Sequence, residues 1–208
     1  MKSLLGNKEL ITLRLIEECT PDQQKDIRNI RNQLSVRASM YSDHLISSEE
    51  HFNWIKSVSG NEKNIVFVVL SDIGKALGVV SFQNYEAKQK KSSWAFYLDK
   101  ELRGGLGAFI EFNFLDFSFI DLGLEKLNCE VLDSNESVIK LHKKFSFLEE
   151  GLRRSEIIKN DNRVGVILLG LLKEEWLSNR EIFISKYSTI FSKYSIAIDA
   201  ERLVKNEI

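Results

Sequence analysis

Apolar and polar positions alternate along the chain with two different periods, and this pattern predicts a mixed α/β fold. In LITLRLIE (10–17) apolar residues recur at roughly every second position, as in a strand; in 20–34 they recur at helical spacing. The other β-rich runs span 64–72, 76–85, 92–99, 125–133 and 163–172, and the other helical runs span 47–58, 108–123 and 135–147. The order β-α-α-β-β-β-α-β-α-β predicts one α/β domain over residues 1–173, with a central mixed, mostly antiparallel sheet flanked by helices.

Local signals support the ends of two helices. The residues TPDQ (20–23) have the composition of a capping box with proline in the first turn. The run 47–58 begins with serines and two glutamates, which favour a helix N-terminus. We expect Phe52, Ile55 and Val58 to form the inward face of this second helix, because they share one side at helical spacing.

The segment 174–208 lies beyond the predicted domain and forms a second unit. Its aromatic and branched residues repeat at helical spacing and predict an amphipathic helix near 178–194; they are Phe183, Tyr187, Ile190, Phe191 and Tyr194. We therefore expect a C-terminal helical extension. Its apolar side packs either on the preceding domain or on a second copy of the chain in a homodimer.

Composition excludes several classes of protein. With 29 basic and 30 acidic side chains, no net charge favours binding to nucleic acid or to an anionic membrane. No apolar run approaches the roughly 20 residues of a membrane-spanning helix, and the N-terminus lacks a signal sequence, so we expect a cytoplasmic protein. Cys19 and Cys129 predict reduced thiols, and His44, His51 and His142 lack the spacing of metal ligands, so no metal is expected.

The stretch WAFYLDKELRGGLGAFIEFNF (94–114) is the most informative motif. Gly104, Gly105 and Gly107 separate a predicted strand from a predicted helix, in a chain with only 11 glycines. The residues match neither a Walker loop nor the dinucleotide fingerprint G-x-G-x-x-G. Glycines at a helix N-terminus favour a pyrophosphate site, because the main-chain amides converge and no Cβ blocks the anion. A plain strand-to-helix turn is the alternative.

Two motifs resemble the GCN5-related N-acetyltransferase (GNAT) superfamily. Residues 102–107, LRGGLG, resemble its pyrophosphate loop, although leucine stands where the family has glutamine or arginine. A second motif, N-x-x-A-x-x-L-Y-x-x-x-G-F, is matched in spacing by residues 135–147, with valine for alanine at 138 and serine for glycine at 146. His142 occupies the place of the family's tyrosine, which acts as general acid.

The resemblance implies a binding site for acetyl-coenzyme A as co-substrate. The residues implied in holding it are Phe96, Tyr97 and Leu98 on the strand, Arg103, Gly104, Gly105, Leu106, Gly107 and Ala108 at the loop, and Asn135. It also implies direct transfer within a ternary complex. His142 would protonate the leaving thiolate or only orient the thioester. Asn135 would contact the pantetheine arm or cap the helix.

Within the superfamily, residues 10–176 resemble the acetyltransferases of pseudaminic acid biosynthesis, a route to flagellin glycosylation. That resemblance implies acetylation of the C4 amine of a nucleotide sugar, UDP-4-amino-4,6-dideoxy-N-acetyl-β-L-altrosamine. The residues implied in binding it are Arg31, Met40, Tyr41, Asp43 and His44. Two alternatives stay open: a protein N-terminal acetyltransferase of the ribosomal-protein type, and a domain that binds acetyl-coenzyme A without catalysing transfer.

Overall fold

The computed structural model describes residues 8–102 and 105–204. Eight strands form one sheet in the order β6-β7-β5-β4-β3-β2-β1-β8. Its strands are β1 (Glu9–Leu15), β2 (Ile65–Leu70), β3 (Ala76–Glu86), β4 (Lys91–Leu98), β5 (Lys126–Leu132), β6 (Leu148–Lys159), β7 (Asn162–Leu172) and β8 (Tyr194–Asp199). Only the β4–β5 and β1–β8 pairs are parallel, so the mixed, mostly antiparallel sheet expected from the sequence is confirmed.

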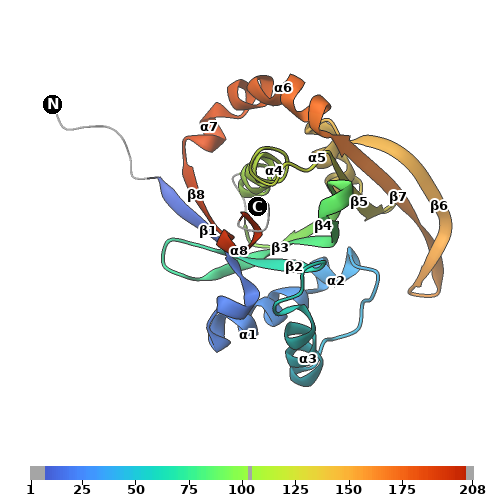
Figure 1. Ribbon diagram of the computed structural model, residues 1–208. Coiled ribbons are helices and arrows are strands. Elements are labelled where there is room, and N and C mark those ends of the chain that lie inside the picture. The colour runs from blue at the N-terminus through green and yellow to red at the C-terminus, as the bar shows by residue number, and fades with distance from the viewer. Residues whose placement is uncertain (1–7, 103–104, 205–208) are drawn as a thin grey trace.

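Helices cover both faces of this sheet (Figure 1). One face carries α1 (Pro21–Arg31), α2 (Leu34–Ala38) and α3 (Ser48–Val58); the other carries α4 (Leu106–Asp116), α5 (Glu136–Lys144), α6 (Lys173–Lys186) and α7 (Ser188–Phe191), and α8 (Glu201–Val204) follows β8. Short 3-10 turns at Ile16–Glu18 and Ala87–Gln89 and a π turn at Phe117–Asp121 complete the elements. The two faces bury separate apolar clusters because side chains alternate along each strand.

The capping signals of the sequence are confirmed. Thr20 and Gln23 form a capping box at α1, and Ser47 and Glu50 form another at α3. The inward face of α3 was predicted wrongly at one position: Phe52 is 54% exposed, and His51 takes its place beside Ile55 and Val58. The His51 ring is accommodated because Nε2 lies 2.8 Å from the main-chain oxygen of Gln24.

The segment after residue 173 differs from the single helix expected there. It forms α6 and α7 and then returns as β8, which pairs in parallel with β1 from Glu9↔Tyr194 to Arg14↔Asp199. The helical extension therefore also contains a strand of the main sheet. Since Trp176 and Phe183 join the same apolar core, the division of the chain at residue 173 stays a prediction.

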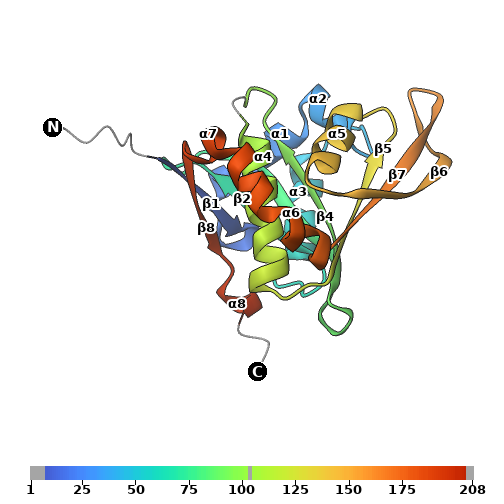
Figure 2. The same ribbon diagram turned by 90° about the horizontal axis from the view of Figure 1, so that it is seen from above.

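Helix α4 lies between the sheet and this C-terminal segment (Figure 1), and Figure 2, seen from above, shows α6 crossing over α4. Phe112 contacts Trp176 and Phe191, with ring centroids 5.1 and 4.7 Å apart respectively. The carboxylate of Asp116 at the end of α4 accepts hydrogen bonds from Trp176 Nε1 (2.9 Å) and Arg180 Nε (2.8 Å). Apolar residues on both sides of α4 are thereby buried, which explains why its sequence lacks a polar face.

Strand β6 and helix α2 also had no counterpart in the sequence prediction. Most residues of β6 are exposed, so this edge strand has no apolar face that a period of two would reveal. Helix α2 has only five residues, too few for a helical repeat to be recognised.

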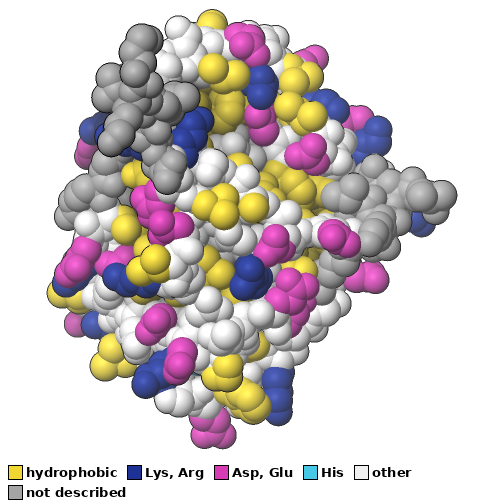
Figure 3. Space-filling view, turned by 90° about the vertical axis from the view of Figure 1, so that its left-hand side faces the viewer, with side chains coloured by type: hydrophobic (Ala, Val, Ile, Leu, Met, Phe, Trp, Pro, Cys, Tyr) yellow, Lys and Arg dark blue, Asp and Glu magenta, His cyan; other side chains and the backbone are white. Residues whose placement is uncertain are grey.

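On the side of the molecule shown in Figure 3, basic and acidic side chains are interspersed. No helix in the described part of the chain is both long and apolar enough to cross a membrane.

Ser146, just after α5, adopts a left-handed conformation with φ of +72°. A non-glycine residue there costs roughly 1–2 kcal/mol, which glycine avoids at some cost in chain entropy. We expect Ser146→Gly to raise the free energy of unfolding by about 0.5–1 kcal/mol in urea denaturation. Lys140→Gly, inside the same helix, is the control and should lower it by about 1 kcal/mol. A Ser146→Gly protein less stable than the parent would contradict the prediction.

Candidate active site

The sheet opens between β4 and β5. The two parallel strands pair only at Lys91↔Lys126, Ser92↔Leu127 and Ser93↔Asn128. Within the described residues, the rest of β4, from Trp94 to Leu98, pairs with β3 but not with β5. The main-chain N–H and C=O groups on its open edge are therefore available to an extended ligand, since unpaired strand edges readily accept one.

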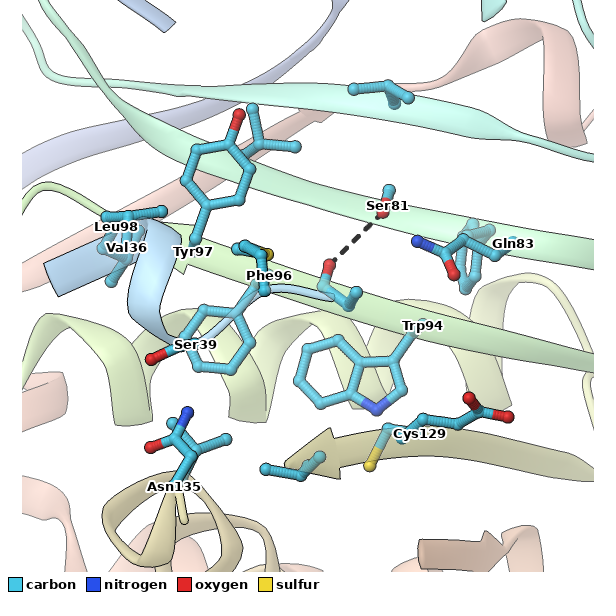
Figure 4. A pocket seen from close by; sticks show the side chains of 18 of the residues that line it. Val36, Ser39, Ser81, Gln83, Trp94, Phe96, Tyr97, Leu98, Cys129 and Asn135 are labelled. Carbon is cyan, nitrogen blue, oxygen red and sulfur yellow. Dashed lines mark hydrogen bonds between the residues drawn. The ribbon is translucent and has the colours of Figure 1, made fainter. Parts of the chain in front are cut away.

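A cavity of about 750 Å³ occupies this opening. Its wall combines residues of α2, α3, β2, β3, β4, β5 and α5. Figure 4 shows Trp94 and Phe96 on one side of β4, Tyr97 on the other, and Asn135 and Cys129 facing them. The structure thus brings together five of the residues predicted for donor or acceptor binding: Phe96, Tyr97, Leu98, Asn135 and Met40. This volume suits a ligand of drug size or larger.

The N-terminus of α4 provides the candidate anion site. Gly105 is its N-cap residue, with φ of +91°, and Leu106, Gly107 and Ala108 form the first turn. The first amides of a helix have no partner within it and carry partial positive charge, which favours a bound phosphate. Arg103 and Gly104, predicted for the same loop, lie outside the described residues.

Gly105 has a second reason to lack a side chain. A Cβ placed on it would lie 2.6 Å from Cδ1 of Ile190 and 3.0 Å from Cγ1 of the same residue. Ile190 belongs to α7, so the C-terminal segment packs directly against the N-cap of α4. Gly107 differs, because its Cβ would meet only Leu98 and Phe96 at ordinary contact distances of 3.8 and 4.0 Å. The sequence predicted that a glycine at position 105 leaves room for a phosphate. Contact with Ile190 is a second reason for glycine there.

Asn135 is the N-cap residue of α5, but its side chain makes no capping hydrogen bond. Its Oδ1 accepts a hydrogen bond from Ser137 Oγ at 3.1 Å, and the residue lines the cavity. Of the two roles considered for Asn135, the geometry therefore favours contact with a ligand over helix capping.

His142 lines the cavity and is held by a residue that the sequence prediction missed. Its Nδ1 is 2.7 Å from Oε1 of Glu111, and the two side chains are only 4% and 0% exposed. The side chain of Cys129 in β5 lies beside the same ring. Burial alone lowers the pKa of His142, but the charge of Glu111, the neighbouring Cys129 and the hydrogen bond to Glu111 outweigh it and raise the pKa well above its ordinary value. His142 is accordingly protonated near neutral pH.

Glu111 could have been noticed in the sequence as the one charged residue between Ala108 and Leu115 in an otherwise apolar helix. Glu130 is the second missed carboxylate, since it lines the cavity from the middle of β5. It accepts a hydrogen bond from the Tyr41 hydroxyl and pairs with Arg153 Nη1 at 2.9 Å. Its signal in the sequence was a charged residue between Cys129 and Val131, two buried positions of β5.

The structure places four of the residues predicted for the acceptor in or near the cavity. Met40 lines the cavity, and Tyr41 reaches it through Glu130. Arg31 interacts electrostatically with Tyr97 in the wall, and its Nη2 donates to Ser42 main-chain oxygen at 3.1 Å. Asp43 lines a neighbouring, smaller cavity beside Arg37 and Lys159.

His44 is not brought to the cavity. Its exposed ring pairs with Glu50 at 3.2 Å, so its position favours a role at the N-terminus of α3.

Known proteins share this fold. Residues 16–164 match the family described as the acetyltransferase (GNAT) domain. The spermidine N-acetyltransferase of Vibrio cholerae, solved with CoA and spermine, has 21% identity and a TM-score of 0.73, over 80% of this chain and 98% of that one. A putative phosphinothricin N-acetyltransferase has 22% identity and a TM-score of 0.65, over 78% and 98%. These structures share the fold, and the family match extends over most of the chain, which therefore belongs to the GNAT acetyltransferases, enzymes that take their acyl group from acetyl-coenzyme A.

Proposed function

We propose that this enzyme acetylates the C4 amine of a UDP-4-amino-4,6-dideoxy sugar, UDP-4-amino-4,6-dideoxy-N-acetyl-β-L-altrosamine, as in pseudaminic acid biosynthesis. The proposal divides the opening between β4 and β5 into a donor side and an acceptor side. The observation that carries it is the charge beside the acceptor side, where cationic side chains gather. The resemblance of residues 10–176 described above implies the sugar.

On the donor side, the chain would hold acetyl-coenzyme A with main-chain groups. The open edge of β4, from Trp94 to Leu98, would pair with the pantetheine amides, and Asn135 would contact the same arm from α5. The amides at the start of α4 would bind the pyrophosphate. These groups fit acetyl-coenzyme A because main-chain hydrogen-bond donors lie both on the open edge of β4 and at the N-terminus of α4.

On the acceptor side, Arg31, Arg37 and Lys159 lie close enough to influence one another electrostatically. Nη1 of Arg31 is buried and has no hydrogen-bond partner within the described residues. Lys159 Nζ donates to the main-chain oxygen of Met40, a residue of the cavity wall, at 2.5 Å. Three cations close to Asp43 favour an anionic acceptor such as a nucleoside diphosphate sugar. A polyamine acceptor would need more carboxylates, whereas Glu130 is the one carboxylate among the described residues that line the cavity.

In the proposed reaction, the neutral C4 amine attacks the thioester carbon while both substrates are bound. A main-chain N–H on the open edge of β4 would stabilise the oxyanion. The C–S bond then breaks with its electron pair on sulfur, and His142 protonates the thiolate. The nitrogen loses one proton as the amide forms, and Glu130 is the carboxylate placed in the wall to take it, directly or through water.

A turnover screen with acetyl-coenzyme A tests the proposal. Free thiol should appear with the UDP-4-amino-4,6-dideoxy sugar but not with spermidine or with peptides bearing free N-termini. Release with peptides alone would favour the protein N-terminal acetyltransferase. A rise in melting temperature with acetyl-coenzyme A, without turnover of any acceptor, would favour a domain that only binds the donor.

A pair of variants checks the acceptor side. Arg31→Met should raise KM for the UDP-sugar by about 10- to 100-fold, because a hydrogen bond to a charged group contributes about 1.5–3 kcal/mol. The affinity for acetyl-coenzyme A should stay the same. Arg163→Met is the matched control, since Arg163 bonds Ser155 in the β6–β7 hairpin at 3.2 Å. Equal KM values for the two variants would contradict the assignment of Arg31.

A further inference from the structure

Helix α4 buries a carboxylate in apolar surroundings. Glu111 is 0% exposed, and its neighbours in the helix, Ile110 and Phe112, are 0% and 5% exposed. Oε2 of Glu111 has no hydrogen-bond partner in the described part of the chain. Taking a carboxylate out of water costs several kcal/mol unless a charge compensates it. The ionised Glu111 therefore needs a positively charged group close to it.

His142 supplies that cation from a different helix. The two residues are 31 positions apart, and the sheet brings α4 and α5 together so that Oε1 of Glu111 meets Nδ1 at 2.7 Å. The other groups facing the ring are the Cys129 thiol from β5 and the rings of Trp94, Phe96 and Phe147. Burial raises the pKa of Cys129, so its thiol stays protonated and adds no charge.

We propose that Glu111 is a positioning residue for acetyl transfer: it fixes the His142 ring through Nδ1, keeps the imidazolium as the resting form, and leaves Nε2–H for the departing thiolate. This inference rests on the proposed role of His142 as the acid. Without the carboxylate, a ring packed among three aromatic side chains would shed its charge, because burial disfavours the imidazolium. Glu111 would therefore not touch the donor and would act through His142.

The proton balance is complete. When the C–S bond breaks, its electron pair stays on sulfur, and sulfur takes the proton of Nε2. The ring becomes neutral and still donates Nδ1–H to Glu111. The nitrogen that forms the amide releases one proton, through Glu130, to solvent, and one proton from solvent restores the imidazolium. No oxidant, metal or covalent enzyme intermediate takes part.

Glu111→Gln separates this role from a structural one. In the parent enzyme, kcat should hold through pH 8 and fall only at higher pH, as His142, whose pKa is raised, loses its proton. In the variant, burial has the largest effect on the pKa of His142. The alkaline fall of kcat should then begin below the ordinary imidazole pKa of about 6.5. At pH 8, kcat should then drop by roughly 30-fold or more, since a pKa 1.5 units below the pH leaves about 3% of the acid form. KM for acetyl-coenzyme A should not change.

Glu111→Asp is the matched conservative variant. It keeps the charge but shortens the side chain, so the alkaline limb should stay close to that of the parent. A structural role alone predicts a lower melting temperature with the same loss of rate at every pH. An alkaline limb that Glu111→Gln leaves in place would overturn the proposal.

A ¹⁵N NMR titration of the His142 ring in the parent and in Glu111→Gln needs no acceptor. The ring should titrate at markedly lower pH in the variant, and unchanged titration would also overturn the proposal. Should titration move as expected while no amino sugar is turned over, the error lies in the proposed acceptor. Should titration move while the rate profile with a working acceptor does not, His142 is not the acid and the proposal fails.

Discussion

Gly105→Glu is expected to abolish measurable binding of acetyl-coenzyme A. The new carboxylate would stand at the N-cap of α4, where the proposed pyrophosphate meets the first amides. Like charges placed together at an interface cost several kcal/mol, so Kd should rise by about 100-fold or more. Isothermal titration calorimetry with acetyl-coenzyme A measures the effect.

The steric effect of a side chain at position 105 must be distinguished from the effect of its charge, because any Cβ on Gly105 meets Ile190. Gly105→Ala should lower stability, and adding Ile190→Ala should restore part of it by making room. Gly105→Glu with Ile190→Ala should still fail to bind the donor. Gly60→Glu is the matched control, since Gly60 also has a positive φ, of +69°, but its Cβ would meet nothing within 4 Å. Unchanged Kd in the Gly105→Glu, Ile190→Ala protein would remove the proposed pyrophosphate site.

His142→Gln is expected to lower kcat by about 10²- to 10⁴-fold, the usual contribution of a general acid, and to change the Kd for acetyl-coenzyme A little. Glutamine is preferred to alanine because its amide can still donate to Glu111, whereas removing one partner of a buried ion pair costs about 3–5 kcal/mol. Pre-steady-state kinetics should show the loss in the chemical step.

His51→Gln is the matched control for that experiment. His51 is also buried, at 7% exposure, but it lies in α3 and bonds Gln24 rather than the cavity. It should lose some stability and keep its kcat. A His142→Gln enzyme that turns over as fast as the parent would refute the assignment of His142 as the acid.

These experiments converge on α4, which links three parts of the molecule. Its N-terminus forms the candidate anion site, its middle holds Glu111 against His142, and its end anchors the C-terminal segment through Asp116. The segment after residue 173, beyond the matched family domain, thus packs on the helix that would position both the donor and the acid. We infer that its packing supports the geometry of the site.

The sequence alone determined most of the secondary structure and the main motifs. Strands and helices with one buried face, such as β1 and α1, carry a clear period, and their capping residues act locally. The glycine-rich loop and the spacing from Asn135 to Phe147 indicated the family for the same reason, since each motif is a short run of residues with a local conformational requirement.

Only the tertiary structure decided which distant residues meet. Glu111 and His142 come together across 31 positions, and Ile190 reaches Gly105 from the end of the chain. The aromatic repeat that predicted one helix also continues into β8, because pairing with β1 outweighs local helical preference at Tyr194–Asp199. The period of apolar residues shows which face of a helix or strand is buried, but not which residues it packs against. Those partners depend on the path of the whole chain.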